Sequence, residues 1–112
     1  MITETYKAWL AGFFDGEGSI CFANDSCKHP RVVLYQRNQR ALFEEVQKLY
    51  GGSLRFMRSG YSKGVHGLNI ERQVEILKFL SDILPYLRIK HEKASLMIAF
   101  CSVYIEIGRA HV

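Results

Sequence analysis

The stretch that decides the fold is Leu10-Ala11-Gly12-Phe13-Phe14-Asp15-Gly16-Glu17-Gly18, or LAGFFDGEG. Its apolar residues recur at helical spacing and predict a helix over residues 4–15, with Thr3 as the N-cap. Another side of this helix has almost no side chains, because alanine and glycine recur there every three or four residues. Such a side allows a second helix to approach closely. The positions expected at this helix–helix interface are Ala8, Ala11, Gly12, Asp15 and Gly16.

Glu17 lies between two glycines, Gly16 and Gly18, which are expected to break the helix directly after Asp15. On a helix that pairs with its symmetry mate, the Glu17 carboxylate lies beside the same carboxylate of the other subunit. Two close carboxylates repel each other, and a divalent cation holds both in the ionised form. The stretch therefore predicts a shared metal site at the helix end, with Asp15 in a structural role beside it.

The rest of the chain alternates strand and helix signals, without a linker or a clear repeat. Strands are expected over residues 19–23, 31–36, 54–57 and 65–71, and helices over 39–50, 73–84 and 89–107. The expected core includes Tyr6, Trp9, Phe13 and Phe14, then Val74, Leu77, Leu80 and Leu84, and finally Ala94, Met97, Ile98 and Cys101. This order predicts an α+β fold in which the helices cover one face of a sheet and leave the other face bare.

Charge is distributed unevenly along the chain, which has a net charge of +4. Residues 28–72 hold nine Lys or Arg and three Asp or Glu, a net charge of +6, whereas residues 1–27 have a net charge of −3. The basic segment supplies three of the four expected strands. A basic patch on a bare sheet face is the electrostatic footprint of nucleic-acid binding.

The LAGFFDGEG stretch closely resembles the signature of the LAGLIDADG homing endonucleases. Gln36, Arg40 and the run Pro85-Tyr86-Leu87-Arg88-Ile89-Lys90 resemble landmarks of the family's single-motif, homodimeric branch. The resemblance extends from Trp9 to about Tyr104 and implies an αββαββα core, with an antiparallel DNA-binding sheet and helices packed on one face. Only one copy of the motif is present, so the active enzyme is expected to be a homodimer.

What the resemblance implies is a site-specific double-strand DNA homing endonuclease, encoded by an intron, an intein or a free-standing element. It would hydrolyse phosphodiester bonds with magnesium, for which manganese could substitute, and leave 3′ overhangs on a long pseudo-palindromic target. The catalytic residues that the resemblance carries over are Glu17, Gln36, Arg40 and Lys90. The metal ligands are the Glu17 carboxylate and the Gly16 carbonyl.

Strand alternation nominates the residues that face the major groove of the DNA. They are Ser19, Cys21, Ala23, Arg31, Val33, Tyr35, Arg55, Met57, Gly67, Asn69 and Glu71. Arg31 and Arg55 are expected to bind guanine O6 and N7, and Asn69 to bind adenine N6 and N7.

Length and composition bound the remaining possibilities. The 112 residues, 48% of them apolar, fit a single packed domain over residues 1–112. No apolar run is long enough to span a membrane, and the N-terminus does not open a signal peptide. Three scattered cysteines argue against a disulfide scaffold and favour a reducing, intracellular location. No small-molecule cofactor is expected.

Two other classes of function remain open. One is a protein of the same fold without nuclease activity, either an RNA maturase or a DNA-binding regulator. The other is an interaction domain with an incidental basic face, which would bind DNA weakly and without sequence preference. A zinc site at Cys21, Cys27 and His29 is disfavoured, because a second ligand pair at the proper spacing is missing.

Overall fold

The computed structural model describes residues 2–22, 29–57 and 64–110. Four α-helices and four strands follow one another in the expected order, and a short 3-10 helix, η2 (Leu84–Tyr86), precedes the last α-helix. The elements are α1 (Glu4–Glu17), β1 (Gly18–Cys21), β2 (Arg31–Arg37), α2 (Arg40–Tyr50), β3 (Ser53–Phe56), β4 (Val65–Ile70), α3 (Gln73–Ile83) and α4 (His91–Ala110). Within the described ranges, no helix is both long enough and apolar enough to cross a membrane.

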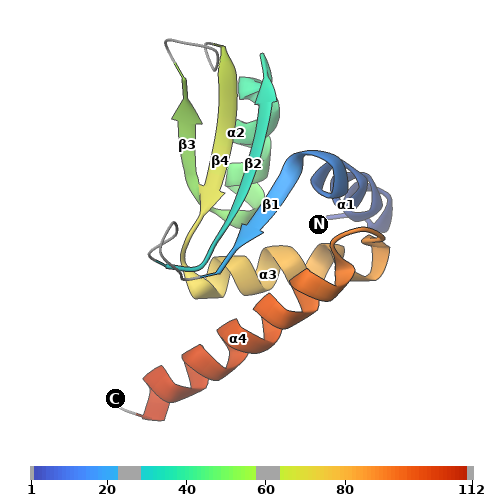
Figure 1. The fold of residues 1–112 in the computed structure, drawn as a ribbon. Helices are drawn as coiled ribbons and strands as arrows, with labels where there is room; N and C mark the ends of the chain where they lie inside the picture. The colour runs from blue at the N-terminus through green and yellow to red at the C-terminus, as the bar shows by residue number, and fades with distance from the viewer. Residues whose placement is uncertain (1, 23–28, 58–63, 111–112) are drawn as a thin grey trace.

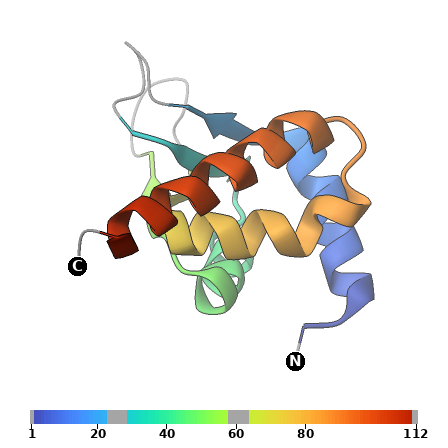
Figure 2. The same cartoon turned by 90° about the horizontal axis from the view of Figure 1, so that it is seen from below.

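The four strands form one antiparallel sheet in the order β1-β2-β4-β3. Helix α2 lies behind the sheet, and α1 stands beside β1 (Figure 1). Helices α3 and α4 run side by side beneath it, as the view from below shows (Figure 2). The face of the sheet that is turned to the viewer in Figure 1 carries no helix. The α+β architecture expected from the sequence, with a bare sheet face, is therefore confirmed.

The core lies between the helices and the covered face of the sheet. Strand β2 contributes Val32 and Leu34, which are fully buried, as its two-residue period predicts. The helices contribute aromatic side chains that meet edge to face, with the ring of Phe79 5.5 Å from that of Phe14 and 5.2 Å from that of Tyr50.

Two of the expected core assignments are wrong. Trp9 is 46% exposed, although its ring stacks on Phe13 at 5.7 Å. On α3, Val74 is 63% exposed, and the buried residues are Ile76, Phe79, Leu80 and Ile83. Apolar residues occur on more than one side of both helices, so periodicity alone did not identify the buried side.

Helix α1 runs two residues beyond the expected break and ends at Glu17. Its C-cap is Gly18, whose backbone N–H donates to the carbonyl of Phe14. Thr3 is the N-cap, as expected, and its hydroxyl accepts a hydrogen bond from the N–H of Tyr6 at 3.0 Å. Glu17 is thus the last residue of the helix, and Gly16 lies within its last turn.

Gly52 follows the C-cap of α2, Gly51, and has a φ of +101°, and a Cβ at Gly52 would lie 2.7 Å from the backbone oxygen of Asn69. We expect Gly52→Ala to lower the free energy of unfolding by about 1–3 kcal/mol, because both the backbone conformation and the close approach to β4 exclude a side chain. Urea unfolding followed by circular dichroism measures this change. Ser53→Ala, at the exposed neighbouring position, is the control, and equal stability of both variants would contradict the expectation.

Candidate functional site

The bare face of the sheet brings together most of the residues expected to contact DNA. Residues directly opposite each other in an antiparallel ladder point to the same face. One row across the sheet joins Ser19, Val33, Asn69 and Ser53, the next joins Tyr35, Gly67 and Arg55, and Cys21 pairs with Arg31. The strand register therefore places eight of the eleven expected residues on this face: Ser19, Cys21, Arg31, Val33, Tyr35, Arg55, Gly67 and Asn69.

The middle of this face is less accessible than strand alternation suggested. Val33 is 7% exposed, Asn69 is 6% exposed, and Gly67 is buried. The ring of Tyr35 covers Gly67, where a Cβ would overlap it, and the Tyr35 hydroxyl donates to Oδ1 of Asn69 at 3.2 Å. In this structure Val33, Gly67 and Asn69 are therefore largely covered, and their expected contacts with bases stay predictions.

Three expected contact residues lie at the borders of the face. Met57 follows β3 and donates its N–H to the carbonyl of Val65 at 3.0 Å, so it extends the hairpin. Glu71 follows β4, and its carboxylate lies 3.6 Å from Nε2 of His29. Ala23 lies outside the described residues.

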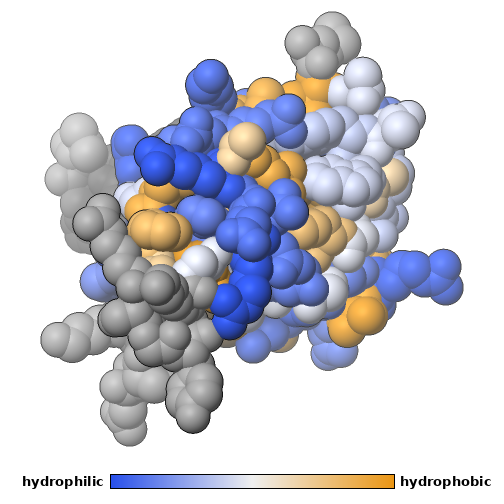
Figure 3. Space-filling view, turned by 90° about the horizontal axis from the view of Figure 1, so that it is seen from above, coloured by the Kyte–Doolittle hydropathy of each residue, from blue (hydrophilic) through white to orange (hydrophobic). Residues whose placement is uncertain are grey.

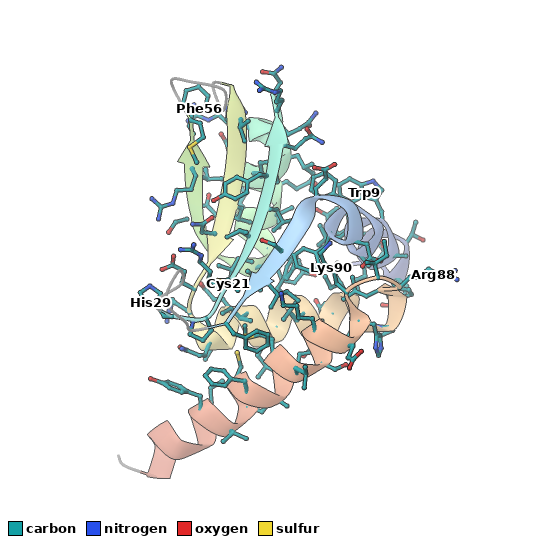
Figure 4. All side chains as sticks on the ribbon, viewed as in Figure 1. Trp9, Cys21, His29, Phe56, Arg88 and Lys90 are labelled. Carbon is teal, nitrogen blue, oxygen red and sulfur yellow. The ribbon has the colours of Figure 1, made fainter. Side chains whose placement is uncertain are left out.

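Cys21 is disulfide-bonded, although the scattered cysteines argued against a disulfide scaffold. Cys101, by contrast, is free and buried, and burial raises the pKa of its thiol. Figure 4 shows Cys21 and His29 together at the lower end of the sheet, at the opposite end from Phe56. Cys21 thus presents no thiol at that end of the bare sheet face.

Two polar residues of the same face, Arg37 and Ser53, were missed by sequence reasoning. Arg37 continues the alternation of Arg31, Val33 and Tyr35, and Ser53 pairs with Asn69. Arg37 lies one residue after the expected strand 31–36, and Ser53 lies one residue before the expected strand 54–57. The same alternation of faces, continued to the next position on each strand, would have predicted both.

The C-terminal end of α1 carries the residues expected to bind metal. Glu17 is exposed, and within the described ranges its carboxylate makes no hydrogen bond or ion pair. The Gly16 carbonyl belongs to the last turn of α1, where carbonyls lack an intrahelical donor and the helix dipole is negative. This end of α1 thus offers two oxygen ligands of the kind that hard cations prefer.

These oxygens fit a divalent cation only if further ligands are added. Within the described part of the chain, no group of three or more His, Cys, Asp or Glu side chains could hold a metal ion. Mg²⁺ is commonly held by one or two carboxylates together with substrate phosphates, rather than by a complete protein cage. One carboxylate and one carbonyl per chain are therefore compatible with a shared, substrate-completed site.

Asp15 ties this end of α1 to the start of α4. Its carboxylate accepts hydrogen bonds from the backbone N–H groups of Arg88, Ile89 and Lys90, at 2.8, 3.2 and 2.9 Å. The ammonium group of Lys90 in turn donates to the Asp15 carbonyl at 2.5 Å. Burial raises the pKa of Asp15, but the three N–H donors outweigh burial, so its pKa lies below the ordinary value. These contacts explain why α4 begins at His91, two residues later than expected.

Asp15 thus brings Lys90 from a distant part of the sequence to the helix end that carries Glu17 (Figure 4). Gln36 approaches the same region through the strand register, because Gly18 pairs with Leu34, two residues before it. Its Oε1 accepts from the N–H of Arg37 at 2.8 Å. Arg40 is the first residue of α2, and its Nε lies 2.8 Å from Glu44. Arg40 is therefore paired within its own helix.

One exposed stripe of α1 is nearly without side chains, as expected for a helix–helix interface. Ala8, Gly12 and Gly16 recur every four residues and are exposed, and a Cβ at Gly12 or Gly16 would meet nothing within 4 Å. The side of the molecule on the right in Figure 3, where α1 lies, is largely pale, which marks residues of intermediate hydropathy. Two expected members differ. Ala11 is fully buried in its own chain's core, and Asp15 is bound to the segment 88–90.

Known protein structures share this architecture. The homing endonuclease I-CvuI, in complex with its target, is 24% identical over 88% of this chain and 67% of that chain, with a TM-score of 0.71. The archaeal intron-encoded homing endonuclease I-Vdi141I, complexed with DNA, is 14% identical over 92% and 70%, with a TM-score of 0.72. I-CeuI, a group I intron-encoded homing endonuclease complexed with DNA, is 17% identical over 95% and 58%, with a TM-score of 0.72. No protein-family model and no curated protein matches the sequence.

This chain has the LAGLIDADG homing-endonuclease fold. The sequence resemblance therefore predicted the architecture correctly, although identity to these structures is below 25%. Within the LAGLIDADG fold, the motif stretch forms the second half of α1 and the turn into β1, and the basic segment forms most of the sheet.

We expect Asp15→Asn to lower the free energy of unfolding by about 1–3 kcal/mol at neutral pH, because the amide cannot replace a charged acceptor for three N–H donors. The folded-state pKa of Asp15 is lowered, so its contribution is present above the unfolded-state pKa and is lost as pH falls through the folded-state pKa. The stabilities of Asp15→Asn and the wild type should thus converge in strong acid. Urea unfolding from pH 7 to pH 2 measures this, with Glu92→Gln on α4 as the control. A difference that stays constant with pH would contradict the assignment.

Proposed function

We propose that this chain is a site-specific DNA endonuclease that acts as a homodimer and hydrolyses phosphodiester bonds with a divalent metal ion. The observation that carries the proposal is the Glu17 carboxylate at the end of α1, which has no partner among the described residues and lies on a helix with an exposed stripe of Ala8, Gly12 and Gly16. Such a helix allows close pairing, and close pairing of α1 helices brings two Glu17 carboxylates together. The DNA-bound homing endonucleases of the same fold support this proposal.

The bare sheet face would bind the major groove of double-stranded DNA. Arg31, Arg37 and Arg55 lie on this face and supply positive charge and hydrogen-bond donors. Guanine presents two acceptors, O6 and N7, which match a guanidinium group. In a twofold dimer the two sheets would contact two related half-sites, so the target would be long and pseudo-palindromic. A DNA substrate places the activity inside the cell.

The metal ligands would be the carboxylate of Glu17 and the carbonyl of Gly16 from each subunit, with the DNA completing the site. A bound Mg²⁺, or Mn²⁺ in its place, would polarise the scissile phosphate and lower the pKa of an attacking water. One chain supplies a single Glu17 carboxylate to the proposed metal site. A dimer would place two Glu17 carboxylates around the same metal ion.

Lys90, Gln36 and Arg40 would act around the phosphate. The ammonium group of Lys90 is held beside the end of α1 and would stabilise negative charge that develops on the phosphate. The Oε1 of Gln36 accepts from the N–H of Arg37, while its NH₂ group has no hydrogen-bond partner among the described residues and would orient water. Arg40 would have to exchange Glu44 for a phosphate, which is inexpensive for an exposed ion pair. Cleavage of opposite strands by the two subunits across the minor groove would leave 3′ overhangs.

Glu17→Gln tests the metal assignment. We expect cleavage of a cognate duplex with Mg²⁺ to fall at least about 100-fold, because the amide cannot hold the cation, while the fold and specific binding persist. A duplex library that contains randomised half-sites supplies the cognate sequence, and gel electrophoresis measures cleavage.

Glu92→Gln, which removes an exposed carboxylate from α4, is the matched control and should cleave normally. Normal cleavage by Glu17→Gln would overturn the metal assignment. Specific binding to DNA or RNA by the wild type without metal-dependent cleavage would instead favour a regulator or a maturase.

Gly12→Leu tests the dimer. A Cβ at Gly12 meets nothing within 4 Å, so the variant chain should fold, but the larger side chain should separate the two α1 helices. We expect analytical ultracentrifugation to show a monomer and cleavage to be lost. Ala99→Leu, which adds the same bulk to an exposed position of α4, should remain dimeric and active. A wild-type protein that is strictly monomeric with its DNA would contradict a shared metal site.

A further inference from the structure

Tyr35 occupies the centre of the bare sheet face because Gly67 has no side chain. Gly67 lies directly opposite Tyr35 in the β2–β4 ladder, and a Cβ at this position would overlap the Tyr35 ring. The aromatic ring therefore lies across the neighbouring strand instead of standing away from the sheet. Arg55 of β3 pairs with Gly67 from the other side, so a tyrosine and an arginine flank the same gap.

The Tyr35 hydroxyl also has a defined hydrogen-bond direction. It donates to Oδ1 of Asn69 at 3.2 Å, from a position diagonal to it in the ladder. The hydroxyl hydrogen is thereby used, and the lone pairs of the hydroxyl oxygen remain as acceptors. Asn69 is 6% exposed, whereas Tyr35 is half-buried and keeps part of its surface accessible.

This arrangement changes which residue can read a base. An asparagine that binds adenine N6 and N7 must offer its oxygen and its NH₂ group together. Oδ1 of Asn69 already accepts from Tyr35, and the side chain is almost completely covered. In place of Asn69, Tyr35 offers its hydroxyl oxygen as a hydrogen-bond acceptor at the surface.

We propose that Tyr35 determines base specificity at the middle of each half-site, and that Asn69 and Gly67 orient it. This inference rests on the proposed DNA-binding function. A hydroxyl oxygen that acts only as an acceptor selects base edges with a donor, which in the major groove are cytosine N4 and adenine N6. Asn69 is thus a positioning residue, because its Oδ1 accepts the hydroxyl hydrogen of Tyr35. Gly67, which has no side chain, leaves room for the Tyr35 ring.

The test compares base preferences of the full-length chain by selection from a randomised duplex library, with Ca²⁺ in place of Mg²⁺ so that binding is measured without cleavage. For the wild type we expect cytosine or adenine at one symmetry-related pair of positions. Tyr35→Phe keeps the ring and removes the acceptor, so preference at this pair should fall by about 5- to 100-fold, with other positions unchanged. Asn69→Ala and Gly67→Ala should alter the same pair, and Arg55→Ala a different one.

Tyr104→Phe, on the exposed side of α4, is the matched control and should keep all preferences. Melting temperatures of every variant show that each chain is folded. The proposal is overturned if Tyr35→Phe keeps the wild-type preferences, or if it weakens binding equally at all sequences. It is also overturned if Asn69→Ala alone changes the preference. A wild-type protein that binds DNA without any sequence preference would overturn the proposed function as well.

Discussion

The carboxylate of Asp15 makes the contact on which the candidate site depends. It accepts three backbone hydrogen bonds from residues 88–90, and these bonds determine where α4 begins. The same contact region holds the ammonium group of Lys90 at the backbone carbonyl of Asp15, which is two residues before Glu17 in α1. Without it, the start of α4 would have three N–H donors without partners, and Lys90 would have no defined position relative to Glu17. One side chain therefore joins helix packing to the proposed chemistry.

Helix α1 meets two requirements at once. Leu10, Ala11 and Phe14 bury one side of it in the chain's own core, while Ala8, Gly12 and Gly16 leave the other side open. The small residues at the open side do not stabilise the single chain, because a Cβ added at Gly12 or Gly16 would meet nothing within 4 Å. A helix that approaches from outside would fit against them, which is the basis of the proposed dimer.

The sequence largely predicted which residues lie on the bare face of the sheet, but it did not predict which of them are accessible or how they hydrogen-bond to one another. The two-residue period of a strand places Arg31, Val33 and Tyr35 on one face whatever the rest of the fold does. Accessibility depends instead on neighbours in other strands. Tyr35 covers Gly67 and binds Asn69, and both lie in β4, more than thirty residues further along the chain. No local pattern in β4 shows that Asn69 is covered.

The sequence by itself determined the order of helices and strands, the faces of the strands and the position of Glu17 at the end of the motif helix, because these follow from spacing within short segments. Only the tertiary structure decided that Ala11 is buried, that Cys21 is paired and that Asp15 holds Lys90, a residue 75 positions away. It likewise decided that Tyr35, and not Asn69, is accessible on the sheet face. The physical reason is the same in each case: burial and hydrogen bonding between distant segments depend on how the segments pack, and packing is a property of the whole chain.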